Sequence, residues 1–204
     1  VIRVISHELN NSLGPIRSLS HTGRLLAQRG DVARLTTVFD TVEERTRHLE
    51  GFIQGYARFA KLPTPRRENV AWAPFLDALA RHYAFHLRGT PPTQSALFDR
   101  AQVEQALINL LKNAHEAGGA SEAVELAVMQ GLREVRIEVA DRGSGMSETV
   151  LANALLPFYS TKRSGSGLGL ALVREIAEAH GGRVQLVNRR GGGLRVSLVL
   201  PTTD

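Results

Sequence analysis

Val135-Arg-Ile-Glu-Val-Ala140 runs directly into Asp141-Arg-Gly-Ser-Gly145. The first six residues alternate apolar and polar side chains, which is the period of a half-buried β-strand. A strand that ends in an aspartate and two glycines is more typical of a turn that faces a ligand than of a plain hairpin. This stretch therefore predicts a sheet that carries a binding site where the strand ends.

A helix is predicted before this strand, over residues 99–117. Asp99 can cap its first turn, and Asn109 and Asn113 lie one turn apart on the side opposite to its apolar face. Asparagine is a poor helix former, so this pair suggests a function, although exposed helical Asn pairs also occur without one. The apolar face consists of Val103, Leu107, Leu110, Leu111 and Ala114.

The part of the chain after the turn predicts a lid, a helix and a hairpin. The periodic pattern weakens between Met146 and Arg163, so we expect a mobile lid there. Gly165-Ser-Gly-Leu-Gly-Leu170 then begins a helix that should end near His180-Gly-Gly182. Two strands, Val184–Val187 and Leu194–Leu200, are joined by a glycine-rich hairpin and complete the sheet.

The glycines of residues 165–169 suit a phosphate, because a helix start exposes backbone N–H groups at the positive end of the helix dipole. The loop is neither a Walker motif, since no Gly-Lys-Ser/Thr follows, nor a dinucleotide fingerprint, since no strand precedes it. Together with Asn113 and Asp141, however, the loop could supply the contacts that a bound ATP needs. The amide oxygen of Asn113 is a hard ligand for phosphate-bound Mg²⁺, and Asp141 can accept a hydrogen bond from the adenine amino group.

Two long amphipathic helices are predicted at the amino-terminal end, with a tight turn at Arg29-Gly-Asp31. Two antiparallel helices cannot bury such apolar stripes well alone, so we expect a homodimer that forms a four-helix bundle. Ser12 and Gly23 fill the remaining positions of the first stripe. The stripes consist of Ile2, Ile5, Leu9, Ile16, Leu19 and Leu26 in the first helix, and Leu35, Val38, Val42, Leu49, Phe52, Tyr56 and Phe59 in the second.

Ser6-His-Glu-Leu-Asn-Asn11 lies on the first helix. His7 should face away from the apolar stripe, with Asn11 one turn further on and Glu8 at its flank. These three polar groups could share one substrate. By itself, however, an exposed helical histidine is more simply interpreted as a solvated surface residue.

Composition and boundaries limit the function classes. We expect two domains, residues 1–60 and 70–204, joined by a proline-containing linker over 61–69. The chain is 43% hydrophobic and 22% charged, which is ordinary for a soluble protein. Its net charge of +5 permits nucleic-acid binding, but the basic residues are scattered and few aromatics interleave them, so we expect no nucleic-acid partner. The absence of cysteine excludes disulfides and thiolate metal sites.

Neither a membrane span of roughly 18 to 20 apolar residues nor a secretory leader is present in the sequence. We therefore expect this piece to be cytoplasmic and to make no membrane contact. Because Val1 already lies in a predicted helix, we also expect a fragment, with any sensor or membrane anchor upstream.

Four ordered segments resemble the N, G1, F and G2 boxes of sensor histidine kinases: Asn109-Leu-Leu-Lys-Asn-Ala114, Asp141-Arg-Gly-Ser-Gly145, Pro157-Phe-Tyr-Ser-Thr-Lys162 and Gly165-Ser-Gly-Leu-Gly-Leu170. His7-Glu-Leu-Asn-Asn11 resembles the H box of the same family, and the sequence around His7 is similar to that of nitrogen-regulation type kinases. The resemblance covers nearly the whole chain.

The resemblance implies a dimeric helical hairpin followed by an α+β Bergerat (GHKL) ATP-binding sandwich, with the nucleotide under the lid. By this likeness Asn113 holds Mg²⁺ and Asp141 recognises adenine. Lys162 could pair with phosphate, although a lid lysine is often only solvated. The remaining expected contacts are Asn109 and Lys112 near the phosphates, Gly143 and Gly145 at the adenine end, and Phe158, Gly165, Gly167, Leu168 and Gly169 around the lid and triphosphate.

The family's chemistry implies that His7 is the phosphoacceptor, with ATP and Mg²⁺ as cofactors. Glu8 would hold the proton-bearing ring nitrogen, and Asn11 matches the position that orients water for dephosphorylation of the partner, a response-regulator receiver domain. Many relatives have proline directly after that position, whereas this chain has Ser12 and its first proline is Pro15. We expect the helix bend to be weaker or displaced.

Alternative functions remain open. A serine kinase or an ATP-driven clamp of the same superfamily would leave the two long helices and the surroundings of His7 unexplained. A non-catalytic dimeric scaffold with bound nucleotide, or a partner-specific phosphatase with little kinase activity, is an alternative of a different class.

Overall fold

The computed structural model describes residues 2–60, 62–118, 123–162 and 167–202, without the side chains of residues 2–8, 48, 54, 55 and 58–60. The chain divides into two compact units. The first, which we call the helical unit, contains α1 and α2; the second, the α/β unit, contains all the other elements.

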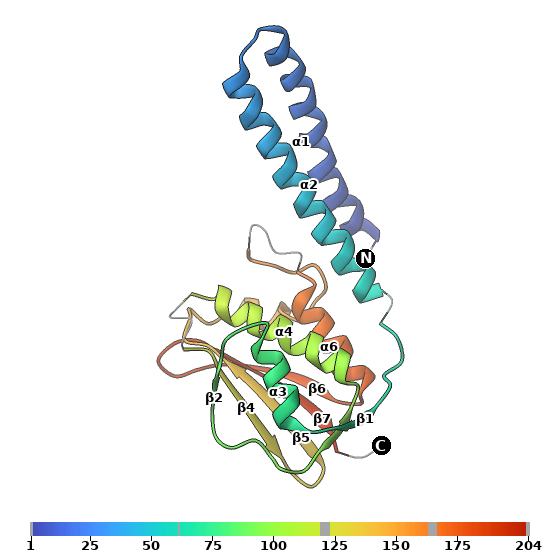
Figure 1. Ribbon diagram of the computed structural model, residues 1–204, viewed down its shortest axis with the longest axis vertical. Helices are drawn as coiled ribbons and strands as arrows, with labels where there is room; N and C mark the ends of the chain where they lie inside the picture. The colour runs from blue at the N-terminus through green and yellow to red at the C-terminus, as the bar shows by residue number, and fades with distance from the viewer. Residues whose placement is uncertain (1, 61, 119–122, 163–166, 203–204) are drawn as a thin grey trace. The chain divides into compact units, whose positions relative to one another are not determined.

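The helical unit is a hairpin of α1 (Ile2–Gln28) and α2 (Val32–Ala60), which pack along each other (Figure 1). The turn between them is made at Gly30, whose φ of +70° suits glycine. The backbone N–H of Asp31 donates to the carbonyl of Leu26 at 3.1 Å, and its carboxylate accepts a hydrogen bond from the N–H of Arg34 at 3.2 Å. Both predicted helices and their turn are confirmed.

The seam between α1 and α2 uses small residues. Ser12 is buried, and a Cβ atom at Gly23 would lie 3.5 Å from both Leu35 and Val38. Pro15 lies inside α1 without ending it. Much apolar surface stays uncovered, because the described stripe residues are mostly half-buried. The most exposed large apolar side chains of the hairpin are Leu13, Leu25, Val32, Phe39 and Ile53.

The α/β unit contains a five-stranded sheet in the order β2-β4-β5-β7-β6. The short β2 pairs with β4 in parallel, and the other neighbours are antiparallel. In the register of the three central strands, Ile137 lies opposite Val128 on one side and Leu198 on the other. The strands span β2 His86–Leu87, β4 Glu125–Gln130, β5 Glu134–Ala140, β6 Arg183–Asn188 and β7 Leu194–Pro201.

Helices α3 (Trp72–Ala80), α4 (Arg100–Glu116) and α6 (Gly169–Ala179) lie on the same face of this sheet (Figure 1). Alternate strand residues such as Ile137 and Leu198 are fully buried against them. The apolar faces predicted from periodicity therefore form one core between helix layer and sheet, and the expected α+β sandwich architecture is confirmed.

A separate two-stranded sheet closes one end of this core. β1 (Glu68–Val70) pairs with β3 (Ala96–Phe98) in antiparallel fashion. Phe98 lies 5.5 Å from Trp72 and 5.4 Å from Phe75 between ring centroids, so the aromatic rings pack together. This cluster anchors the chain that leads into α4.

Two local details differ from the sequence-based expectations. A short helix, α5 (Glu148–Asn153), lies in the segment where we expected a mobile lid without periodic structure. None of its residues is buried, so its sequence carries no periodic apolar pattern by which a helix is predicted. Its start is marked by the Ser147 hydroxyl, which accepts a hydrogen bond from the N–H of Val150 at 3.3 Å. β2 and β3 were not predicted, because each has three residues or fewer. None of the described helices is both long and apolar enough to cross a bilayer.

Candidate functional site

The two asparagines of α4 lie beside the start of α6. Asn109 and Asn113 are half-buried, while the opposite side of α4 faces the core. A Cβ atom at Gly169 would lie 3.8 Å from Oδ1 of Asn109 and 3.9 Å from Nδ2 of Asn113. The segments that resemble the N and G2 boxes therefore meet in space.

At the start of α6, the N-cap side chain does not cap the first backbone donors of the helix. Its N-cap residue is Leu168, which makes no side-chain capping hydrogen bond, whereas Asp99 caps α4 and Ser147 caps α5. The first N–H groups of a helix have no partner within the helix and carry a partial positive charge. These groups could bind phosphate oxygens next to the two asparagine amides.

Asp141 is held at the end of β5 by backbone donors. Its side chain is buried, and its Oδ1 accepts hydrogen bonds from the N–H groups of Gly143 at 2.8 Å and Leu194 at 3.1 Å. Among the residues that the structure describes, no hydrogen bond to Oδ2 is found. One oxygen is therefore used to orient the carboxylate, and the other can accept a hydrogen bond from a ligand.

The glycines after Asp141 allow close approach of other backbone segments. A Cβ atom at Gly143 would lie 2.5 Å from the carbonyl oxygen of Ala117, just after α4. Gly145 has a φ of +70°, and a Cβ atom there would lie 2.8 Å from Oδ1 of Asn188. The turn is thus packed between the end of α4 and the β6–β7 hairpin, and side chains at these positions would push it away.

Phe158, in the segment predicted as a lid, lies next to Gly167 at the start of α6. The N–H of Phe158 donates to the carbonyl oxygen of Gly167 at 2.9 Å, and both residues have a φ of +66°. A Cβ atom at Gly167 would lie 2.5 Å from the carbonyl carbon of Phe158, so only glycine fits. Lys162 is exposed, with its N–H bonded to the Ser160 hydroxyl at 3.1 Å. Gly165 lies outside the described residues.

Two residues of the β6–β7 hairpin support this turn and were not predicted. The Asn188 carboxamide accepts from the N–H of Met146 at 2.9 Å and donates to its carbonyl at 2.6 Å. Arg189 donates to the main-chain oxygen of Asp141 at 2.9 Å and pairs with Glu125 at 3.1 Å. In the sequence these residues signalled only a hairpin, because their partners lie far away along the chain.

His180 joins the ends of α4 and α6. Its ring is 1% exposed, its Nε2 accepts from the N–H of Asp99 at 3.0 Å, and its Nδ1 donates to the carbonyl of Ile176 at 2.8 Å. Burial lowers the pKa of His180, because the charged ring would lose its hydration. The neutral ring thus holds the cap of α4 against α6, which is a structural role.

The predicted residues of the H box belong to the helical unit. His7 and Glu8 lie within α1, and their side chains are outside the described part. Asn11 is exposed on α1. Lys112 is exposed on α4, with its Nζ 3.9 Å from the carboxylate of Glu116. The roles of these four residues remain predictions.

The residues of the α/β unit fit ATP with Mg²⁺ in their chemistry. An amide oxygen at Asn113, the first helix N–H groups of α6 and a carboxylate oxygen at Asp141 match a metal ligand, phosphate donors and an adenine acceptor, respectively. The absence of a Cβ atom at Gly169 leaves space between the first two of these groups. These residues could hold the nucleotide.

Comparison with known proteins agrees with this chemistry. Residues 98–204, more than half of the chain, match the family "Histidine kinase-, DNA gyrase B-, and HSP90-like ATPase". Sensor protein FixL of Bradyrhizobium diazoefficiens is 30% identical over 215 residues, and nitrogen regulation protein NtrY of Azorhizobium caulinodans is 29% identical over 219. The alignments cover 98% and 97% of this chain but only 43% and 28% of those proteins, so the chain spans less than half of their length.

A solved structure agrees as well. The catalytic domain of histidine kinase ThkA superposes with a TM-score of 0.61 at 25% identity, covering 68% of this chain and 97% of that domain. The similarity to NtrY is consistent with the resemblance of the sequence around His7 to nitrogen-regulation type kinases. The chain therefore belongs to the family of histidine kinase-, DNA gyrase B- and HSP90-like ATPases, and its relatives place it among the sensor histidine kinases.

Proposed function

We propose that this chain is the kinase part of a sensor histidine kinase, which transfers the γ-phosphoryl group of ATP to His7. From His7 the group would pass to an aspartate on a response-regulator receiver domain. The observation that carries the proposal is the meeting of Asn109 and Asn113 with the uncapped start of α6 at Gly169. This arrangement places amide groups and helix N–H donors around one space, as a triphosphate requires.

The α/β unit would bind and orient ATP. The free oxygen of Asp141 would accept a hydrogen bond from the adenine amino group, while the first N–H groups of α6 would bind phosphate oxygens. Mg²⁺, held in part by Asn113, would neutralise charge on the phosphates when bound. The segment predicted as a lid, between Met146 and Arg163, would cover the nucleotide, and Lys162 would pair with a phosphate.

The helical unit would supply the nucleophile. A neutral imidazole nitrogen of His7 attacks the γ-phosphorus, so that an N–P bond forms while the bond to the ADP oxygen breaks. Glu8, the next residue, would accept the hydrogen bond of the other ring nitrogen and stabilise the positive charge that develops there. Asn11, exposed on the same helix, would orient water when the phosphorylated regulator is hydrolysed.

A second copy of the chain would complete the helical unit. The hairpin leaves Leu13, Phe39 and Ile53 each at least half exposed, together with the half-buried stripe residues. Two such hairpins could bury these side chains against each other as a four-helix bundle. Sedimentation of the chain at increasing concentration tests this dimer, and a monomer at all concentrations would contradict it.

The kinase assignment is tested by incubation with γ-³²P-labelled ATP and Mg²⁺. We expect a label that is labile in acid and stable in alkali, as a phosphohistidine is, and that is absent from His7→Gln. The matched control is His21→Gln, because His21 is an exposed histidine on the same helix. Loss of label in His21→Gln but not in His7→Gln would refute the assignment of the phosphoacceptor, and an acid-stable label would favour a serine kinase.

The nucleotide site is tested separately by binding. Asn113→Asp should weaken Mg-ATP binding and abolish labelling, because a carboxylate beside the start of α6 repels the phosphates. Asn69→Asp is the control, since Asn69 is an exposed asparagine on β1. Nucleotide binding without any label would indicate a scaffold or a phosphatase. In the phosphatase assay on a phosphorylated regulator, Asn11→Ala should lose activity.

The direction of transfer within the dimer can be decided with mixed dimers. One protomer would lack His7 and the other would lack Asn113. Label on the protomer that lacks Asn113 shows transfer between protomers, and its absence shows transfer within one protomer. Either result is compatible with the proposed reaction.

A further inference from the structure

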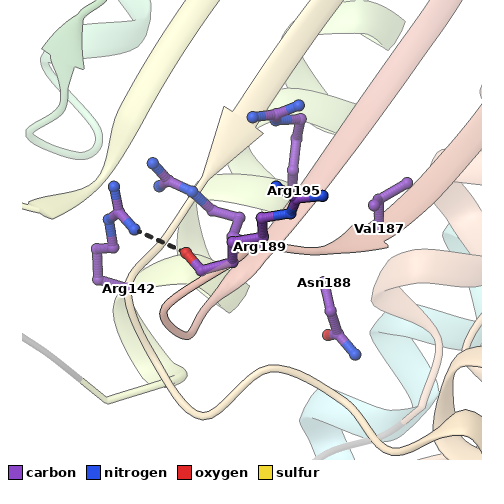
Figure 2. A pocket seen from close by; sticks show the side chains of 6 residues that line it. Arg142, Val187, Asn188, Arg189 and Arg195 are labelled. Carbon is purple, nitrogen blue, oxygen red and sulfur yellow. Dashed lines mark hydrogen bonds between the residues drawn. The ribbon is translucent and has the colours of Figure 1, made fainter.

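A cavity of about 340 Å³ lies beside the β6–β7 hairpin, lined by Arg142, Val187, Asn188, Arg189, Arg190 and Arg195 (Figure 2). Val187 and Arg195 are opposite each other in the register of β6 and β7. Arg195 lies between Leu194 and Val196, which face the core, so Arg195 is on the other face of the sheet. The cavity therefore opens on the face of the sheet away from the helices. None of the predicted nucleotide-binding residues that the structure describes lines it.

Two of the four arginines in the wall have a carboxylate partner. Arg189 pairs with Glu125 at 3.1 Å. Arg195 lies 3.7 Å from Glu138, which already accepts a shorter contact of 2.8 Å from Arg88. The charge of Arg195 is thus only weakly compensated, because its carboxylate is shared.

The other two arginines have no carboxylate partner in the part of the chain that the structure describes. Arg142 and Arg190 are both exposed, and Nη1 of Arg142 donates only to the main-chain oxygen of Arg190, at 3.5 Å. Figure 2 shows Arg142, Arg189 and Arg195 gathered around the same space. With Arg88, this part of the sheet carries five guanidinium groups. Among the described residues, the carboxylates that pair with them are those of Glu125 and Glu138, which leaves a local surplus of three positive charges.

We propose that this cavity binds a small anion that carries a diphosphate group or a similar pair of phosphates. Guanidinium groups bind phosphate oxygens through two parallel N–H donors, and a multiply charged anion matches the local surplus. A volume of about 340 Å³ lies at the lower end of small-molecule pockets, roughly 300 to 1,000 Å³. It accommodates more than a single ion but not a large ligand.

The position of the cavity distinguishes it from the nucleotide site. Arg142 follows Asp141 directly, but it points to the cavity, whereas the Asp141 carboxylate is buried. The wall residues Asn188 and Arg189 bond the backbone of Met146 and Asp141. The anion would therefore lie behind the turn that carries Asp141, and its binding does not depend on the proposed role of that residue.

The test is equilibrium dialysis of the full 204-residue chain with ³²P-labelled pyrophosphate in Mg²⁺-free buffer. We expect one site per chain, with affinity at least tenfold weaker in Arg142→Gln/Arg190→Gln. These side chains are exposed, so the double variant should fold. The matched control is Arg81→Gln/Arg133→Gln, which removes two exposed arginines of the same unit with the same change of charge, and which should keep the affinity.

Three results would overturn the proposal. Equal affinity of the two double variants would show that pyrophosphate responds only to net charge. Loss of pyrophosphate binding in Asn113→Asp, with binding retained in Arg142→Gln/Arg190→Gln, would place pyrophosphate in the nucleotide site instead. Binding of citrate as tight as that of pyrophosphate would show that the cavity does not select phosphates. Retention of one pyrophosphate in Asn113→Asp supports the separate site.

Discussion

Arg189 bonds the main-chain oxygen of Asp141 at 2.9 Å and, with its other terminal nitrogen, pairs with Glu125 of β4 at 3.1 Å. Its side chain is only 9% exposed. The hairpin between β6 and β7 thus holds the backbone of the turn whose carboxylate is proposed to recognise adenine. This contact joins β4 to the turns that follow β5 and β6.

Replacement of Arg189 by methionine should weaken ADP binding by about tenfold. Methionine keeps the apolar stem but removes the charge-assisted hydrogen bond, worth roughly 1.5 to 3 kcal/mol, part of which positions Asp141. Calorimetric titration with ADP and with tripolyphosphate measures the effect. We expect a larger loss for ADP, because only ADP carries adenine. Arg136→Met, which removes contacts to Gln185 and Glu134 on the same sheet, is the control. An unchanged affinity for ADP in Arg189→Met would contradict the positioning role.

Gly169→Ala should lower the affinity for ATP without lowering the free energy of unfolding. The new Cβ atom would lie in ordinary contact with Asn109 and Asn113, so the fold accepts it, and alanine in a helix raises the free energy of unfolding by up to about 1 kcal/mol. The same methyl group fills the space proposed for the phosphates, so ATP affinity should fall at least tenfold. Unaltered ATP affinity, measured beside unfolding by denaturant, would exclude this space as the phosphate site.

Gly143→Ala should destabilise the α/β unit by about 1 to 3 kcal/mol, because the Cβ atom would lie 2.5 Å from the backbone oxygen of Ala117 and the turn must move. Unfolding can be followed by the fluorescence of Trp72, the one tryptophan of the sequence, which is buried in this unit. Gly131→Ala is the control, since its Cβ atom would be 3.6 Å from the nearest atom. Equal stability of the two variants would show that the turn tolerates a side chain.

The stability of the α/β unit should fall on acidification through His180. Burial lowers its pKa in the folded state, so below the unfolded value of about 6.5 the unfolded chain binds a proton that the folded chain does not. The contribution is fully present above that pH and is lost as the pH falls towards the folded pKa, by at most about 1.4 kcal/mol per pH unit.

The measurement for His180 is the free energy of unfolding between pH 7.5 and pH 5.5, again by Trp72 fluorescence. His180→Gln should be less stable throughout but should show a smaller decrease over this range than the unchanged chain. His86→Gln, which alters an exposed histidine of β2, should keep the full decrease. A decrease of the same size in all three proteins would assign the pH dependence to other groups.

Local patterns in the sequence predicted most elements of the fold. The apolar periods of α1, α2, α4 and α6 and the alternation of β5 and β7 depend on neighbouring residues only, so they are visible without the structure. β2 and β3 were not visible because two or three residues carry no measurable period, and they form through pairing with distant strands. α5 was missed because it buries nothing.

Asn188 and Arg189, which support the site, could not be predicted from the sequence for a related reason. Asn188 bonds Met146, and Arg189 bonds Asp141 and Glu125, across separations of 42 to 64 residues. Nothing near these residues in the chain indicates such contacts. In the sequence, an arginine in a polar hairpin is indistinguishable from one that faces solvent.

The sequence by itself determined the order of the elements and the chemistry of each motif, because amide, carboxylate and glycine positions are properties of single residues and their neighbours. Only the tertiary structure decided which motifs meet: the packing of α4 on α6 brings Asn113 to Gly169, and the register of β6 and β7 brings Arg189 to Asp141. Packing and strand register are non-local, since they depend on how whole apolar faces cover one another, and no short stretch of residues contains that information.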